Sequence, residues 1–208
     1  AVNEATDLSN TAINPSSVTI TASENGIMTT LTDLARNSAP RNVAADIGKL
    51  FGEAIAKKID TDLTALFDGF STAVGAADAA LTVAKLFESV ANLRNSAVPI
   101  NDVSAVLHPM IAYDLKANLT NTFANSNAND LANEALRNGF VGRIAGVPIF
   151  ETSNLANTGT TGDYKNGVFH RDALGLAMMQ DLKIETQRDA SLRADEIVAT
   201  AVYGVGEL

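Results

Sequence analysis

One long helix is the clearest prediction from the pattern of apolar and polar positions. Apolar side chains recur at steps of three and four residues over one continuous stretch, which is typical of a helix that buries one face. These positions are Val43, Ile47, Leu50, Phe51, Ile55, Ile59, Leu63, Leu66 and Phe67. Pro40 suits a first helical turn, which predicts Ser38 or Ala39 as the N-cap, and Asp68-Gly69 predicts the end. At about 28 residues the helix would be about 40 Å long, whereas helices of soluble domains average about 11–12 residues.

Alternation of apolar and polar residues predicts a strand near the start of the chain. Val18, Ile20 and Ala22 alternate with threonines, and Asn25-Gly26 follows them. Asn-Gly predicts a hairpin whose return strand would be residues 27–31, but a single long strand kinked at this dipeptide fits the same pattern.

The C-terminal part of the chain predicts a strand pair. Alternation around Ile184 is followed by a longer alternating run from Ile197 to Val205. A charged segment, RDASLRADE at residues 188–196, joins the two runs. The pattern predicts an antiparallel hairpin with this segment as its tip.

The middle of the chain predicts shorter, mixed elements. A small-residue connector leads to an amphipathic helix over residues 83–93, and VSAVL at 103–107 reads as a buried strand. His108-Pro109 then predicts a turn into a short helix that reaches Leu119. A polar loop over 120–130 and one more short helix over 131–140 would follow.

The stretch GRIAGVPIFETSNL, residues 142–155, raises the question of a phosphate-binding loop. Gly142 and Gly146 match the spacing of neither phosphate-binding fingerprint, and no Gly-Lys-Ser/Thr follows. The residues that follow are β-branched and aromatic, which predicts a strand after a turn. Pro148 predicts that this strand lies at a sheet edge or begins only beyond the proline.

Composition indicates a globular chain that repels nucleic acid. It is 46% hydrophobic and 19% charged, with a net charge of −9 and no basic run interleaved with aromatics. The absence of a long apolar run predicts a soluble protein without a membrane span. The first residue is alanine, from which we expect that the start of the chain has been lost by processing or truncation.

Candidate chemistry is sparse. The chain has no cysteine, which excludes disulfides and thiolate metal sites. His108 is expected to cap the following helix, and His170, although it could pair with Asp172, is expected in a surface or turn role. Acidic pairs are expected on solvated helix faces or turns; they are Asp60/Asp62, Asp130/Glu134 and Asp195/Glu196. No zinc or calcium ligand spacing is present, so we predict no catalytic residue, no metal and no cofactor.

Four stretches together resemble the major capsid proteins of tailed bacteriophages, which have the Hong Kong 97-like fold. SAPRNVAADIGKLFGEAIAKKIDTDLTALF resembles the spine helix of the family, and VSAVLHPMIAYDL resembles a strand, turn and helix of its A-domain. GRIAGVPIFETSNL resembles a recurring entry to a strand. The segment from NGVFHRDALGLAMMQDLKIETQRD through DEIVATAVYGVGEL resembles the C-terminal module. Together they cover about residues 35–70 and 100–208.

The resemblance implies an α+β fold with a long spine helix, a β-sheet P-domain and a mixed α/β A-domain. Residues 1–16 would be the remnant of an extended loop, and 17–75 would hold the P-domain strands and spine helix. Residues 76–178 would form the A-domain, and 179–208 would return to the P-domain as its C-terminal strand pair. The family carries an arm and the first half of the extended loop before the point where this chain begins.

The function implied by the resemblance is structural. Subunits would form hexamers and pentamers of an icosahedral shell around double-stranded DNA, in a virion assembled in the host cytoplasm. Partners would be other copies of the chain, with scaffolding, portal and decoration proteins as further candidates, and neither a membrane nor a specific nucleic-acid sequence. An encapsulin-type shell around protein cargo and a mixed α/β enzyme are the alternatives.

The hairpin tip is the candidate contact between capsomers. In the family the corresponding tip meets its counterparts at local threefold points. Charges of both signs suit a self-complementary contact around a symmetry axis. The residues concerned are Arg188, Asp189, Arg193, Asp195 and Glu196. The alternative is a solvated turn.

Overall fold

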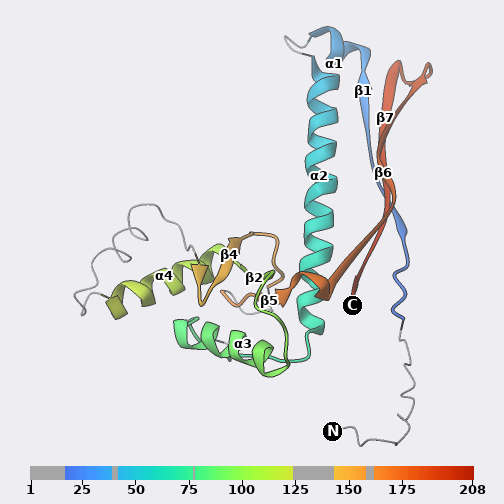
Figure 1. Cartoon of the computed structure of the whole chain (residues 1–208). Helices are drawn as coiled ribbons and strands as arrows, with labels where there is room; N and C mark the ends of the chain where they lie inside the picture. Colours follow the sequence, from blue (N-terminus) through green and yellow to red (C-terminus); the bar gives the residue numbers. More distant parts are fainter. Residues whose placement is uncertain (1–16, 39–41, 77, 124–142, 158–161) are drawn as a thin grey trace, which may run out of the picture.

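The computed structural model describes residues 17–38, 42–76, 78–123, 143–157 and 162–208. A long helix runs beside a tall, narrow sheet, and a compact mixed part lies against one end of that helix (Figure 1). The architecture is α+β, with a three-stranded and a four-stranded sheet.

The long helix is α2, Val43–Ala65, continued by a 3-10 turn over Leu66–Gly69. Its predicted end at Gly69 is confirmed. The predicted N-cap is wrong: Asn42 is the cap, and its Oδ1 accepts a hydrogen bond from the Ala45 amide at 3.4 Å. Ser38 instead ends a separate short helix, α1 (Asp33–Ser38), while Ala39 and Pro40 lie outside the described residues.

The three-stranded sheet is antiparallel and has the order β1-β7-β6. Its strands are β1 (Ser23–Thr32), β6 (Leu174–Asp189) and β7 (Ala194–Glu207), which confirms the C-terminal strand pair. Of the two alternatives at Asn25-Gly26, the hairpin is wrong and the single strand is confirmed from Ser23 onward, because both residues pair with β7 in one continuous ladder. Residues 17–22 form no strand, so the strand predicted from the alternation of Val18, Ile20 and Ala22 is wrong. Pairing with β7 along its whole length overrides the local turn preference of Asn-Gly.

Helix α2 packs on one face of this sheet. Phe51 of α2 contacts a buried cluster with Leu31 of β1 and Ile197 of β7, and Ile55 lies in a second cluster with Tyr203. The α2-facing residues of β7 are therefore the odd-numbered ones, since successive side chains of a strand point to opposite faces. Leu50, predicted in the apolar stripe, is exposed.

The four-stranded sheet has the order β3-β4-β2-β5, with β2 and β4 parallel and the other pairs antiparallel. The strands are β2 (Val103–Leu107), β3 (Arg143–Ile144), β4 (Val147–Glu151) and β5 (Gly167–His170). Helices α3 (Val83–Asn95) and α4 (Pro109–Phe123) contribute to one core with β2 and β4. Strand 103–107 and helix 83–93 are confirmed. Helix α4 runs four residues past Leu119, so the loop predicted from 120 begins too early, and helix 131–140 lies outside the described residues.

Gly146 of GRIAGVPIFETSNL, one of the glycines that raised the question of a phosphate-binding loop, belongs to the turn before β4. Ala145 and Gly146 both have positive φ, 55° and 83°, as the tight turn between β3 and β4 requires. The strand after the turn is thus confirmed. β4 begins at Val147 and lies between β3 and β2, so the predicted edge strand is wrong. Pairing with β2 does begin only beyond Pro148, at Ile149, and this ladder does not need the missing N–H.

Candidate inter-subunit contact site

The predicted hairpin tip is shorter than the charged segment. Arg188 still pairs with Asp195, and Asp189 with Ala194, so the turn itself is residues 190–193. Asp189 Oδ1 shapes the turn by accepting hydrogen bonds from the Ser191 amide at 2.8 Å, the Ser191 hydroxyl at 2.6 Å and the Leu192 amide at 3.2 Å. These bonds, the Ser191 hydroxyl foremost, lower the pKa of Asp189.

An alternating ion-pair chain lies at the same end of the sheet. The Arg188 guanidinium forks onto Asp33, with Nη2–Oδ2 at 2.6 Å and Nη1–Oδ1 at 2.7 Å, and Nη1 also lies 3.2 Å from Asp195 Oδ1. Arg36 pairs with the other oxygen of Asp195. The hydrogen bond from Arg188 lowers the pKa of Asp33, and the same bond raises the pKa of Arg188.

The structure therefore divides the five predicted residues. Arg188 and Asp195 belong to the ion-pair chain, and Asp189 holds the turn. Arg193 is exposed at the turn with a positive φ of 50°, and its carbonyl accepts from the Asp33 amide at 3.0 Å. Glu196 is half-buried in β7.

Three further residues at this end were missed from the sequence. Asp33 and Arg36 come from α1, 155 and 159 positions from the residues they bind. Leu192 exposes 57% of its surface at the turn. The only available signal for Asp33 and Arg36 was their place directly after a strand that would have to pair with β7. Leu192 could have been found as an apolar residue inside a charged turn.

Both histidines act as the sequence predicts. His108 Nδ1 accepts from the Met110 amide at 3.3 Å, which caps the start of α4, and its ring stacks on Tyr164 with centroids 3.4 Å apart. Burial lowers the pKa of His108. His170 Nδ1 accepts from the Asp172 amide at 3.2 Å at a short turn. Within the described residues no cluster of three or more His, Asp or Glu side chains could hold a metal.

Asp60 and Asp62 are not the solvated helix face that the sequence predicts. Asp60 Oδ2 accepts from Thr152 Oγ1 at 2.9 Å and Asn154 Nδ2 at 2.5 Å, beyond the end of β4. Asp62 Oδ2 accepts from the Tyr203 hydroxyl of β7 at 2.7 Å. Side chains two positions apart on a helix point to nearly opposite sides. The two carboxylates therefore connect α2 to both sheets. The pair Asp130/Glu134 lies outside the described residues.

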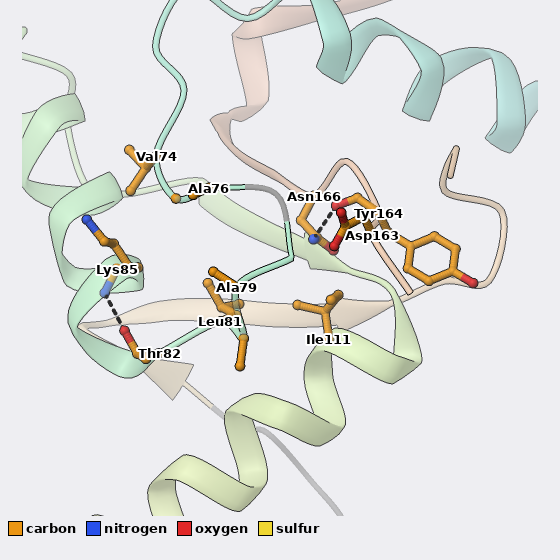
Figure 2. Close-up of a pocket in the computed structure, with 12 residues that line it drawn as sticks. Val74, Ala76, Ala79, Leu81, Thr82, Lys85, Ile111, Asp163, Tyr164 and Asn166 are labelled. Atoms are coloured by element: carbon orange, nitrogen blue, oxygen red, sulfur yellow. Dashed lines mark hydrogen bonds between the residues drawn. The ribbon is translucent and has the colours of Figure 1, made fainter. Parts of the chain in front are cut away.

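A cavity of about 580 Å³ lies between the connector before α3, the start of α4 and residues 163–166 (Figure 2). Its lining is mostly small and apolar, with Ala76, Ala79 and Ile111 among the side chains. The Asp163 carboxylate accepts from the Asp78 amide, and Lys85 Nζ pairs with Glu88 at 2.8 Å. The described lining residues offer no nucleophile–base pair. Among the described helices, none has the length and apolarity to cross a bilayer.

Phage capsid proteins are similar to this chain in both sequence and structure. The model of a family described as "Phage capsid protein" matches residues 16–207. The capsid structure of cyanophage P-SCSP1u is similar with a TM-score of 0.71 and 20% identity, over 97% of this chain and 77% of that one. A structure of Mycobacterium phage Che8 is similar with a TM-score of 0.68 and 23% identity, over 88% of this chain and 66% of that one. No curated protein matches the chain.

An encapsulin has the same fold at greater distance. The holo-SrpI encapsulin complex of Synechococcus elongatus PCC 7942 is 12% identical, with a TM-score of 0.66, over 90% of this chain and 70% of that one. The fold common to these structures is the mixed helix–sheet fold of phage capsids, the Hong Kong 97-like fold. This chain belongs to the phage capsid protein family, and it is a structural shell protein of the virion head.

Proposed function

We propose that the chain is the major capsid subunit, which assembles into hexamers and pentamers and closes an icosahedral shell around phage double-stranded DNA. The family match over residues 16–207 carries the proposal. The net charge of −9 supports it, because a negatively charged shell repels the DNA phosphates and therefore does not bind the DNA tightly during packaging. Assembly would take place in the host cytoplasm, with scaffolding, portal or decoration proteins as further partners.

The domain division is proposed on the same basis. Residues 17–75 form the P-domain strands and spine helix, 76–178 the A-domain, and 179–208 the C-terminal strand pair, while residues 1–16 lie outside the described residues. The boundary after residue 178 falls inside β6, which is continuous from Leu174 to Asp189. The P-domain sheet therefore receives its last two strands from residue 174 onward.

Strand β6 supports self-assembly through its exposed apolar side chains. It is an edge strand, and the side chains of Leu182 and Ile184 reach α2 at Gly52 and Gly48. Large apolar side chains are exposed along it; they are Leu176, Met178, Met179, Leu182 and Ile184. An exposed apolar edge strand is a liability in a monomer. In a shell, other copies of the chain cover it.

The hairpin tip is the proposed contact between capsomers. Arg193 and Leu192 point outward at the turn and make the contact, while Arg188, Asp189 and Asp195 hold the turn in shape, with Glu196 beside them. Arg193→Glu should leave the subunit folded and lower the yield of shells, measured by sedimentation with circular dichroism as the folding control. Arg171→Glu is the matched control, since it reverses the charge of a 79% exposed arginine elsewhere. Normal shells from Arg193→Glu at both low and high salt would exclude the tip as a contact.

An encapsulin-type compartment is the second candidate, supported by the structural match to the SrpI encapsulin complex. Light scattering and negative-stain microscopy of the full-length protein test both shell functions, because either gives particles of tens of nanometres. Nuclease-protected double-stranded DNA in native particles indicates the phage head, and protein cargo indicates the compartment. A strict monomer at all salt and pH values would contradict both.

A further inference from the structure

Residues 17–22, which we call the strap, cross the face of the three-stranded sheet that is turned away from α2. The ladder between β1 and β7 begins at Ser23, opposite Tyr203. Before that point the chain leaves the plane of the sheet and crosses the C-terminal strands (Figure 1). The strap is extended but makes no strand of its own.

The strap lies on three glycines, Gly175 of β6 and Gly204 and Gly206 of β7, which we call the glycine seat. Gly204 and Gly206 alternate with the α2-facing residues and so belong to the opposite face. Gly175 is the register partner of Gly206. The seat is therefore one bare patch shared by two strands, whereas further along this face β7 carries Val198, Thr200 and Val202.

The strap lies too close to the three glycines of the seat for any of them to carry a side chain without displacing it. A Cβ atom on Gly204 would lie 2.4 Å from the Thr21 carbonyl oxygen, which is a backbone atom and can move only with the strap. A Cβ on Gly206 would lie 2.9 Å from Ile20 Cγ1, and one on Gly175 would lie 2.8 Å from Ile20 Cδ1. Ile20 fills the volume that three side chains would occupy, and the strap backbone rests on that of the sheet.

We propose that the glycine seat is the docking site of the strap of the same chain, and that this docking is needed for the subunits to assemble into shells. The strap touches neither buried cluster between α2 and the sheet, so it serves assembly rather than subunit folding. The assembly part rests on the proposed capsid function, whereas the docking itself does not.

A disulfide tests the docking directly. Ile20 Cβ lies 3.9 Å from a Cβ built on Gly206, within the range of about 3.5–4.5 Å for disulfides, and Ile20→Cys removes the Cγ1 that would clash. The chain has no other cysteine. The Ile20→Cys/Gly206→Cys protein should form an intrachain bridge in intact particles, seen as a faster, reducible single-chain band. Ile20→Cys/Val198→Cys, with the second cysteine far along the same face, should not bridge. Covalent oligomers or no bridge in the first pair would overturn docking within one chain.

A glycine pair tests the role in assembly. Gly204→Ala should raise the rate at which thermolysin cleaves within residues 17–22 roughly tenfold and reduce shell yield, with the unfolding transition unchanged. Gly26→Ala is the matched control on the same face, because its Cβ would meet Thr200 Cγ2 at an ordinary 3.4 Å. Ile20→Ala adds no bulk to the seat and should give the same two effects, so it replaces Gly204→Ala if that variant fails to fold. Unchanged cleavage in Ile20→Ala would overturn the seat, and faster cleavage with normal shells would overturn its role in assembly. If the unaltered protein forms no particles, the capsid proposal fails, while cleavage and bridging in the free subunit still decide the docking.

Discussion

The two sheets of this subunit reach very different degrees of burial. In the four-stranded sheet, Leu107 of β2 and Val147 of β4 are 1% and 0% exposed, because α3 and α4 share one core with these strands. In the three-stranded sheet, one strand, β7, is well buried, while Leu176 and Ile184 of β6 remain 44% exposed. The compact part buries its apolar side chains within the subunit. The three-stranded sheet leaves the edge of β6 and the charged turn at 190–193 exposed, and we infer that other copies of the chain cover them.

The largest expected effect lies in the core of the compact part. Leu115→Ala removes a fully buried side chain of α4 and should lower the free energy of unfolding by about 2–5 kcal/mol. Leu182→Ala is the matched change on β6, where the side chain is already 39% exposed, and should cost less than about 1.5 kcal/mol. Urea unfolding of dissociated subunits measures both. Equal losses would break the contrast between the two parts.

Alkaline pH should weaken the contact of α2 with β7. Burial, with the hydrogen bond to Asp62, raises the pKa of Tyr203 to about 12. A raised tyrosine pKa favours the neutral form in the folded state, so this stability is complete below the ordinary value of about 10 and is lost as pH rises from 10 to 12. The slope there should reach about 1.4 kcal/mol per pH unit. Tyr203→Phe should flatten it, as measured by denaturation at each pH, and an unchanged slope would contradict the assignment.

The joint between α2 and the compact part depends on Asp60. Asp60→Ala leaves Thr152 and Asn154 without their shared acceptor and should cost about 1–3 kcal/mol in thermal or chemical unfolding. Glu53→Ala, an exposed carboxylate on the same helix, is the control and should stay within about 0.5 kcal/mol. A loss no greater than that of the control would show that the carboxylate does not tie the two parts together.

The charged end of the tall sheet should matter least for the isolated subunit. Arg188→Gln removes the fork onto Asp33 but should change the free energy of unfolding less than any of the variants above, since the pair is exposed and screened by salt. The lowered pKa of Asp33 adds stability above its ordinary pKa, and this is lost as pH falls through the lowered value. The difference between the variant and the unaltered protein should therefore shrink in acid, as acid titration followed by circular dichroism would show. A difference that grows in acid would contradict the ion-pair assignment.

Local patterns predict the elements well but not their partners. The stripe from Val43 to Phe67 predicts α2 and its end, and the alternation around Ala201 predicts β7, because both depend on side-chain period alone. Asn25-Gly26 fails as a turn signal because β7 offers β1 a continuous edge, a contact made across the whole length of the chain.

In the candidate site too, local sequence patterns predict the residues of one segment but not the partners that reach it from elsewhere in the chain. Five of its residues stand in one charged segment and can be found from the sequence. Asp33 and Arg36 reach that segment only because β1 runs antiparallel to β7, which places its end beside the start of β7. Asp60 and Asp62 likewise read as a solvated face, since their partners Asn154 and Tyr203 are 94 and 141 positions away.

Hydrogen exchange of assembled particles against dissociated subunits tests most directly whether other copies complete the tall sheet. We expect amides of β6 and the turn at 190–193 to become protected on assembly, while those of β2 and the first turns of α4 exchange equally slowly in both states. Equal exchange of β6 in particles and free subunits would contradict this expectation.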